Sequence, residues 1–420
     1  MGTRIFRNTA VAPADQLEAV PATTSAARIK PSGEVDLPLI LIMVAMLTFG
    51  LIMVFSASPD FSLYQHGDAW LIFSRQVLWV ILGCAVAYVL SRIDYHYWRV
   101  LVLPFMLVTL VLLIGVLLVG DVRLGSMRGL FSGSIQPSEL AKVATVIYLS
   151  VWLHSKREQF HDITWGLLPL GVILGMIGGL IYLQPDLSAT ATVFMLGGLL
   201  FFLAGGDLRQ IIFLFLAALI AGFLVVQVSA TGQERLGAFI NGIQNPMDAS
   251  YHVRRSLEAI VKGGFFGVGI GLADTKYLGL PLAATDSIFA VIAEELGIFG
   301  SLGLIFLYAG LAWRGLRIAA KAPDLLGNLL VTGLIFWIIT EATFNILAMV
   351  GLMPFAGNAL PFVSAGGSSM IVSLIAIGII MNVSRHSRAE TQKTERREYG
   401  AILDLRGRNR RRSVSRPGRS

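Results

Sequence analysis

Residues 38–57 read PLILIMVAMLTFGLIMVFSA, a stretch without a single charged side chain. A helix of this length can cross the hydrocarbon core of a bilayer, which is about 30 Å thick and needs about 20 apolar residues. The whole chain has the same character, because 55% of its 420 residues are hydrophobic and only 14% are charged. A soluble domain carries about 25% charged residues, so the sequence predicts an integral membrane protein.

Nine further apolar runs of comparable length follow the first one. The ten runs cover residues 38–57, 70–90, 101–119, 138–153, 165–183, 187–204, 211–228, 287–313, 325–350 and 367–383. They predict an all-α polytopic membrane protein with about ten transmembrane helices.

The segments outside the runs divide the chain into three parts. Residues 1–37 form an N-terminal extension, residues 38–384 form the membrane domain, and residues 385–420 form a basic tail. Both terminal segments are polar, so we expect them to be disordered. The loop of residues 229–285, between the seventh and eighth runs, is unusually long, and loops of this length usually have a function.

The basic residues between the runs predict the orientation of the chain. If the N-terminus is inside, the inside segments before the tail hold 12 Lys and Arg residues, whereas the short outside loops hold only Arg123 and Arg128. Cytoplasmic loops of membrane proteins carry the excess of positive charge. Both termini are therefore expected in the cytoplasm, and the long loop is expected outside.

The charge and the cysteine content exclude several other classes of protein. The net charge is +7, but 12 of the 33 Lys and Arg residues lie in the tail, which indicates membrane-surface contact or disorder and not nucleic-acid binding. The single cysteine, Cys84, lies in an apolar run, so no internal disulfide or thiolate metal site is expected. No dedicated spacing of metal ligands is evident, although a divalent cation (Mg²⁺ or Mn²⁺) stays open as a partner of an anionic substrate.

Ionisable side chains within apolar runs are costly and usually face a cavity or the interior of a helix bundle. In this chain they are Glu139, Lys142, Asp186, Asp286, Glu294, Glu295 and Glu341, the last accompanied by Asn345 on the same helix face. Glu139 and Lys142 are three residues apart and can pair, so a structural ion pair and a substrate contact both stay open. Asp186 and Asp286 each precede a run, and an N-cap is the alternative to a functional role for both.

Asp286 is the strongest candidate for a functional group. It joins the eighth run to the long loop, whose basic residues include Arg235, Arg254, Arg255 and Lys262. A carboxylate beside such cations suits a general base next to an anionic substrate. Asp286 opens the helix of the eighth run, so Glu294 lies about 12 Å deeper and roughly 80° around its axis, and Glu295 points away. At most one of these glutamates then shares a cavity with Asp286, and we expect the other to pair with a neighbouring helix.

Two glycine-rich segments flank this candidate. Residues 263–271 contain alternating glycines, but no βαβ unit surrounds them, so a nucleotide-binding loop is rejected. Their expected use is close approach of main chains. Residues 351–369 join the ninth and tenth runs. Irregular main chain at membrane depth is tolerated only against protein or a wet cavity, so this segment is expected to line the same outer vestibule.

Several motifs in a fixed order resemble the SEDS family (shape, elongation, division and sporulation). They are Gln136-Pro137-Ser138-Glu139 with Lys142, Gln184-Pro185-Asp186-Leu187, the glycines of residues 263–271, Thr285-Asp286-Ser287-Ile288-Phe289-Ala290, Glu294-Glu295-Leu296-Gly297, Leu360-Pro361-Phe362-Val363-Ser364 and Gly366-Gly367-Ser368-Ser369. Any one motif is weak, whereas the ordered set from residue 136 to residue 369 is specific.

The resemblance implies a peptidoglycan glycosyltransferase that polymerises lipid II at the outer face of the bacterial cytoplasmic membrane. It implies that the aspartate of the Thr-Asp-x-Ile-Phe motif, here Asp286, is essential for catalysis. We expect inversion at the anomeric carbon and release of undecaprenyl pyrophosphate. Candidate substrate-binding residues are Lys142, Glu139, Asp186, Arg235, Arg254, Lys262 and Ser368. Expected partners are a class B penicillin-binding protein (a transpeptidase) and other division or elongation proteins of the membrane, with division slightly favoured.

Three departures from the family pattern keep other functions open. Residues 280–285 lack the usual His or Glu before the aspartate, Ala365 replaces a usual Tyr, and Gly129 replaces the Trp of an Arg-Trp pair. A transporter or lipid II flippase is one alternative, because Glu294, Glu341, Asn345 and Lys142 would also serve a translocation path. A non-catalytic membrane scaffold for cell-wall enzymes is the other.

Overall fold

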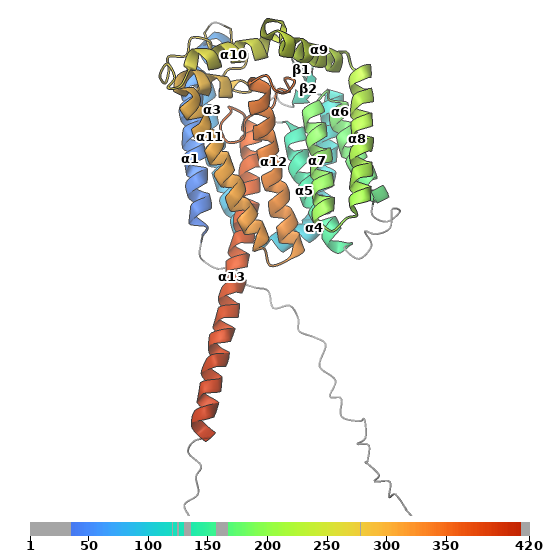
Figure 1. Cartoon of the computed structure of the whole chain (residues 1–420), viewed down its shortest axis with the longest axis vertical. Coiled ribbons are helices and arrows are strands. Elements are labelled where there is room, and N and C mark those ends of the chain that lie inside the picture. The colour runs from blue at the N-terminus through green and yellow to red at the C-terminus, as the bar shows by residue number, and fades with distance from the viewer. Residues whose placement is uncertain are drawn as a thin grey trace, which may run out of the picture.

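A computed structural model of the protein describes residues 35–119, 121–123, 126–129, 136–156, 167–277 and 279–412. The helices that match the ten predicted runs lie side by side in one bundle (Figure 1). They are α1 (Leu37–Ala57), α3 (Leu71–Arg92), α4 (Trp98–Val119), α5 (Pro137–Ser155), α6 (Leu168–Tyr182), α7 (Leu187–Leu203), α8 (Leu208–Val228), α11 (Ile288–Ala320), α12 (Leu325–Met349) and α13 (Gly367–Arg412). α12 packs against α5, α7, α10, α11 and α13 and so lies inside the bundle.

Length and hydropathy identify six of these helices as candidate membrane spans within the described residues. The spans are α1, α3, Tyr95–Leu118, α11, α12 and Gly367–Ala389, and the shorter apolar helices are Leu168–Tyr182, Leu187–Leu203 and Leu208–Ile220. The predicted all-α polytopic membrane fold is confirmed. The count of ten spans and the cytoplasmic position of both termini stay predictions.

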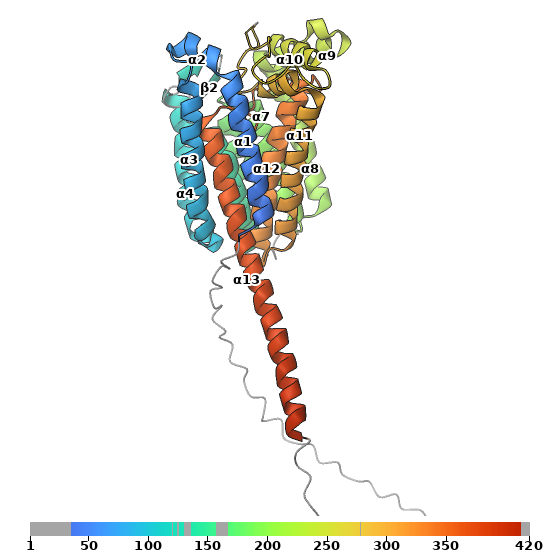
Figure 2. The same cartoon turned by 90° about the vertical axis from the view of Figure 1, so that its left-hand side faces the viewer.

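Smaller elements lie mainly at one end of the bundle (Figures 1 and 2). They are α2 (Pro59–His66), η1 (Tyr95–Tyr97), the antiparallel strands β1 (Asp121–Arg123) and β2 (Ser126–Gly129), α9 (Ala230–Gln244), η4 (Pro246–Asp248) and α10 (Tyr251–Gly263). α9 and α10 lie across that end, and α13 extends away from the opposite end. The long loop is therefore largely helical. We call its described part, residues 229–277 and 279–285, the outer layer, after the predicted orientation.

α11 is interrupted at Gly297, where the main chain adopts φ 68° and ψ −163°. The glycine-rich segment packs against this break: the amide of Val268 donates to the carbonyl of Glu294 at 2.9 Å, and that of Ile298 donates to Gly264 at 3.0 Å. A Cβ atom on Gly263 would collide with a carbonyl oxygen of α11. The predicted close approach of main chains is thus confirmed, and the glycines permit it.

α13 differs from the tenth predicted run, which ended at residue 383. The helix continues to Arg412, so residues 385–412 of the predicted disordered tail are helical. The sequence there contains nine Arg and three Glu residues, and both residue types favour helix. Residues 1–34 and 413–420, for which disorder was also predicted, lie outside the described residues.

Asp36 ties the start of α1 to the part of α13 that leaves the bundle. Its Oδ1 accepts a hydrogen bond from the amide of Leu39 at 3.2 Å and so caps α1. Arg314 of α11 donates to both carboxylate oxygens, at 2.9 and 2.6 Å. Ser384 of α13 donates to Oδ2 at 3.0 Å. The structured part of the chain therefore begins before residue 38.

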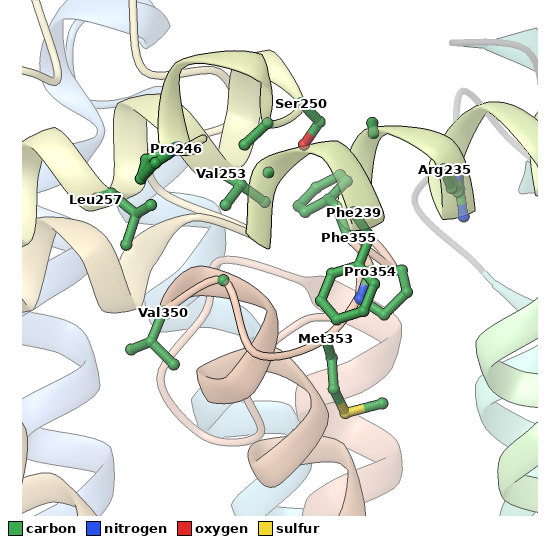
Figure 3. Close-up of a pocket in the computed structure, with 14 residues that line it drawn as sticks. Arg235, Phe239, Pro246, Ser250, Val253, Leu257, Val350, Met353, Pro354 and Phe355 are labelled. Atoms are coloured by element: carbon green, nitrogen blue, oxygen red, sulfur yellow. The ribbon is translucent and has the colours of Figure 1, made fainter. Parts of the chain in front are cut away.

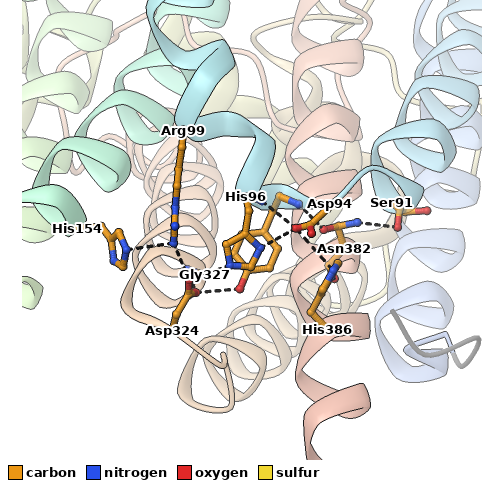
Figure 4. Close-up of polar contacts among 10 residues, drawn as sticks. Ser91, Asp94, His96, Arg99, His154, Asp324, Gly327, Asn382 and His386 are labelled. Atoms are coloured by element: carbon orange, nitrogen blue, oxygen red, sulfur yellow. Dashed lines mark hydrogen bonds and ion pairs between the residues drawn. The ribbon is translucent and has the colours of Figure 1, made fainter. Parts of the chain in front are cut away.

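A second polar network holds the same end of the bundle (Figure 4). Asp324 caps α12 by accepting from the amide of Gly327 at 2.8 Å, and it also accepts from the hydroxyl of Tyr95 at 2.8 Å. Arg99 donates to its other oxygen at 3.3 Å, and Nε2 of His96 lies 3.1 Å from that oxygen. These contacts join the turn between α3 and α4 to the start of α12.

Candidate functional site

Asp286 lies in a turn between the outer layer and α11. The N-cap of α11 is Ser287, and the helix begins at Ile288, so the alternative that Asp286 is the N-cap is wrong. The turn forms because Leu282 adopts φ 52° and its carbonyl accepts from the amides of Thr285 (3.0 Å) and Ser287 (3.2 Å). Asp286 therefore precedes the helix, and the helical spacing assumed between it and Glu294 does not apply.

The main chain at Asp286 is held by α12. Nδ2 of Asn345, which is buried, donates to the carbonyl of Asp286 at 2.7 Å and to the carbonyl of Asn358 at 2.6 Å. One amide group thus joins α12, the start of α11 and the segment between α12 and α13. Asn345 had been selected from the sequence only because it shares a helix face with Glu341.

The segment between α12 and α13 holds the two residues before Asp286. The hydroxyl of Ser364 donates to the carbonyl of Thr285 at 2.7 Å, and the amide of Ala365 donates to the carbonyl of Ala284 at 2.8 Å. With the bond from Asn345, the carbonyls of residues 284, 285 and 286 each accept a hydrogen bond from a group outside α11. The segment of residues 351–369 therefore contacts the Asp286 turn, and its place in an outer vestibule stays a prediction.

α3 fixes this segment in turn. Nε2 of Gln76 donates to the carbonyl of Ser364 at 3.1 Å, and its Oε1 accepts from the amide of Gly366 at 3.2 Å. Gln76 is buried, so both halves of its amide need partners. Nothing in the sequence singled out Gln76, because it lies 288 residues from Ser364.

Asp186 is a buried N-cap, as one of its two interpretations predicted. Its Oδ1 accepts from the amide of Ala189 at 3.2 Å and from the hydroxyl of Ser188 at 3.0 Å, and its Oδ2 accepts from the hydroxyl of Ser138 at 3.2 Å. The hydroxyl of Ser188 also lies 2.6 Å from Oδ1 of Asn358. A chain of polar groups therefore runs from Asp186 through Asn358 toward the Asp286 turn.

Lys142 lies between two carboxylates inside the bundle. Its Nζ contacts Oε1 of Glu139 at 2.8 Å and Oε1 of Glu341 at 2.5 Å, and the ring of Trp337 lies 5.7 Å away. All three charged residues are buried. The predicted pair with Glu139 is confirmed, and Glu341 is a third member that spacing alone did not reveal. Buried charges of this kind persist only when they are paired.

Ser368 belongs to the first turn of α13 and lies beside the start of α5, where its Oγ accepts a hydrogen bond from the amide of Gln136 at 3.2 Å. This contact brings the beginning of α13 to the beginning of α5, one turn before Glu139. Lys142, Glu139, Asp186 and Ser368 thus come from one region, around the ends of α5, α7 and α13.

Glu294 and Glu295 hold the outer layer to the bundle. Glu294 accepts from the amides of Asp274 (3.0 Å) and Thr275 (3.3 Å) and also from the hydroxyl of Thr275. Glu295 pairs with Lys276 at 2.9 Å and accepts from the hydroxyl of Ser56, in α1, at 2.6 Å. The prediction that one of the two glutamates contacts a neighbouring helix is confirmed.

The predicted cations of the long loop lie on α9 and α10. Lys262 and Arg255 flank Glu258, with closest distances of 3.6 and 2.7 Å. Arg254 lies over the ring of Tyr251 at 5.6 Å. Arg235 belongs to α9 and lines a cavity beneath it (Figure 3). The cations therefore form part of the outer layer, separate from the buried Lys142.

This fold and this site define a class: a multi-pass helical membrane protein in which the end covered by α9 and α10 carries an aspartate turn held by buried polar groups. The family model FTSW_RODA_SPOVE, described as cell cycle protein, matches residues 37–389. The chain belongs to this family, and the resemblance to the SEDS proteins is confirmed.

Named relatives cover nearly the same region. Stage V sporulation protein E of Bacillus subtilis (strain 168) is 38% identical over 364 residues, which is 84% of this chain and 98% of the relative. A protein of Trichlorobacter lovleyi named "Probable peptidoglycan glycosyltransferase FtsW" is 37% identical over 358 residues, 84% of this chain and 93% of the relative.

Two solved structures share the fold. One is described as "Structural coordination of polymerization and crosslinking by a peptidoglycan synthase complex"; it has a TM-score of 0.70 at 26% identity and covers 84% of this chain and 98% of the other. The other is the rod shape determining protein RodA of Thermus thermophilus, with a TM-score of 0.63 at 26% identity, covering 84% of this chain and 97% of the other.

Proposed function

We propose that the protein is a peptidoglycan glycosyltransferase that polymerises lipid II at the outer face of the bacterial cytoplasmic membrane. The relatives named as such glycosyltransferases support the reaction class. The observation that carries the site is the fixing of three successive carbonyls, residues 284–286, by groups outside α11. A reacting carboxylate needs such a fixed position, because small misplacements are costly in rate.

Asp286 acts as the general base in this proposal. Its carboxylate takes the proton of the acceptor sugar hydroxyl as that oxygen attacks the anomeric carbon of the donor. The bond from the anomeric carbon to the phosphate oxygen breaks, undecaprenyl pyrophosphate leaves with the bonding electrons, and the anomeric configuration inverts. A positioned base contributes roughly 10²- to 10⁴-fold in rate.

Cations stabilise the charge that develops on the leaving pyrophosphate. We assign this binding to Arg235, Arg254 and Lys262 on the outer layer. The substrate contacts on the bundle side come from Lys142, Glu139, Asp186 and Ser368. The charge of Lys142 is already neutralised there by two carboxylates. Among the described residues, no group of three or more His, Cys, Asp or Glu side chains is arranged to hold a metal. A divalent cation would therefore take most of its ligands from substrate oxygens and water.

The proposal includes a partner with crosslinking activity. A solved neighbour is described as a complex that coordinates polymerisation and crosslinking. We propose a class B penicillin-binding protein as the partner of this chain, together with other division or elongation proteins of the membrane.

The decisive experiment replaces Asp286 with Asn in the purified full-length protein, alone and with its partner. We expect lipid II polymerisation per folded molecule to fall by roughly 10²- to 10⁴-fold, with the folded fraction measured by thermal unfolding. Asp248→Asn is the matched control, because Asp248 is an exposed acid of the same outer layer. Full polymerisation by the Asp286 variant would contradict the assignment, and lipid II movement across proteoliposomes without any glycan product would favour the flippase instead.

A further inference from the structure

A cavity of about 240 Å³ lies between the outer layer and the segment that follows α12 (Figure 3). Its roof comes from α9, η4 and the start of α10, and its floor comes from residues 350–355. Figure 3 shows Phe239 and Ser250 on the roof side and Phe355, Pro354 and Met353 on the floor side.

The lining of the cavity is apolar except at a few points. Aromatic and aliphatic side chains form most of the wall, including Phe239, Val253 and Phe355. Arg235 is the single charged residue of the lining. The hydroxyl oxygen of Ser250 is buried and has no hydrogen-bond partner within the described part of the chain. Such a wall suits a hydrocarbon chain that carries an anionic group at one end.

The volume limits the length of chain that fits. A cavity of about 150 Å³ lined by Leu, Ile and Phe binds benzene, which has six carbon atoms. By the same ratio this cavity accepts about ten carbon atoms. It therefore suits two isoprene units and not a complete long-chain lipid.

α9 presents a second apolar face beside the cavity. Leu236, Ile240 and Ile243 are exposed and recur at helical spacing, so they form one stripe. The stripe is rotated by roughly 90° from the face that carries Phe239 and Arg235 toward the cavity. A helix with an exposed apolar stripe that lies across the end of a membrane bundle is typical of the lipid interface. A lipid in the outer leaflet can therefore approach the cavity from the side.

The floor of the cavity continues into the candidate active site. Phe355 is three residues from Asn358, and three residues span at most about 11 Å. The carbonyl of Asn358 shares Asn345 with the carbonyl of Asp286. A ligand in the cavity therefore contacts the segment that positions the aspartate turn.

We propose that this cavity binds the phosphate-bearing end of a polyprenyl lipid, with about two isoprene units between Phe239 and Phe355 and the phosphate near Arg235. The inference rests on the proposed function for the presence of such lipids at this face. It assigns a position to the lipid end of donor or product, whereas Asp286 acts on the sugars.

The first test is photolabelling of the full-length protein in detergent by a ten-carbon prenyl phosphate that carries a diazirine at its far end. We expect label on α9, α10 or residues 350–355. Ala238→Trp fills the cavity and should reduce labelling at least tenfold. Val261→Trp places the same ring on an exposed position of α10 outside the cavity lining and should leave labelling unchanged. Equal labelling of both variants, or label confined to other helices, would overturn the proposal.

The second test concerns the phosphate. Competition against the label should be at least tenfold stronger for geranyl phosphate than for geraniol, because a charge-assisted hydrogen bond favours the anion. Arg235→Gln should remove this preference and leave competition by geraniol unchanged. A preference that survives in the Arg235 variant would overturn the placement of the phosphate. Equal competition by decyl phosphate would overturn the isoprenoid assignment. Competition by geranyl pyrophosphate, measured beside geranyl phosphate, shows whether the site prefers the pyrophosphate of the product or a monophosphate.

Labelling and polymerisation are independent measurements. If the protein polymerises lipid II but shows no specific label, this inference is wrong and the proposed function is unaffected. A protein that is labelled in the cavity but forms no glycan has lost the proposed function and retains a prenyl phosphate site.

Discussion

Asp286 and Asp324 lie at opposite ends of the bundle, and the fold holds them differently. The carboxylate of Asp324 contacts Tyr95, Arg99 and the amide of Gly327 (Figure 4). Burial raises its pKa, but the hydrogen bonds from His96, Gly327 and Tyr95 outweigh burial and lower the pKa to about 2. This side chain connects the turn between α3 and α4 to the start of α12 and so stabilises the fold.

At Asp286 the fold holds the main chain. The carbonyls of residues 284–286 accept bonds from Ala365, Ser364 and Asn345. Such bonds fix the main chain from which the side chain of Asp286 projects. The fold thus uses the carboxylate at Asp324 and fixes the main chain at Asp286, and three substitutions measure what such buried contacts contribute.

The largest expected effect on stability is at Lys142. Lys142→Met leaves Glu139 and Glu341 buried without their cation, and breaking a buried ion pair in this way costs about 3–5 kcal/mol. We expect a clear fall in the midpoint of thermal unfolding in detergent. Lys262→Met is the control, since Lys262 is exposed and its contact with Glu258 is 3.6 Å long. Equal unfolding midpoints of the two variants would mean that the buried ion cluster does not stabilise the fold.

The next effect, on activity, is expected at Asn345. Asn345→Ala removes the bond to the carbonyl of Asp286, and a misplaced reacting group costs on the order of 10²-fold in rate. We expect kcat to fall while KM changes little, because the substrate contacts are intact. Asn345→Asp sharpens the test: its carboxyl can donate only when protonated, so its activity relative to the wild type at the same pH should rise as the pH is lowered. A purely structural role predicts loss of folded protein and no such pH dependence.

Sequence reasoning identified these residues unevenly. Asp186 could be predicted as a cap because it follows Gln184-Pro185 and precedes an apolar run, and capping is a local interaction. The bonds that position Asp286 could not be predicted, since Asn345 lies 59 residues away and Ser364 lies 79 residues from its partner. Contacts of this kind depend on how helices pack and leave no periodic signal in the chain.

The main chain of α11 shows the same limit. The apolar pattern of residues 287–313 is continuous, yet the helix is broken at Gly297. A single glycine in a helical pattern is compatible with an unbroken helix. The break is decided by the glycine-rich segment that packs there, and its glycines did indicate a close approach. Composition thus predicted the membrane class and the helices of the bundle, whereas the site depended on long-range packing.

The smallest expected effect is at Asp324, and it completes the contrast with Asp286. Its pKa is lowered from 3.8 to about 2, which corresponds to about 2 kcal/mol of stability. A lowered pKa of an acid stabilises the fold above its unfolded value near pH 4, and this contribution is lost as the pH falls through about 2. Asp324→Asn should therefore lower stability by up to this amount at pH 7, with roughly half of that difference left at pH 3, while lipid II polymerisation per folded molecule stays unchanged. The measurement is thermal unfolding of both proteins across this pH range. A variant that keeps its stability but loses polymerisation would reverse the roles assigned to the two aspartates.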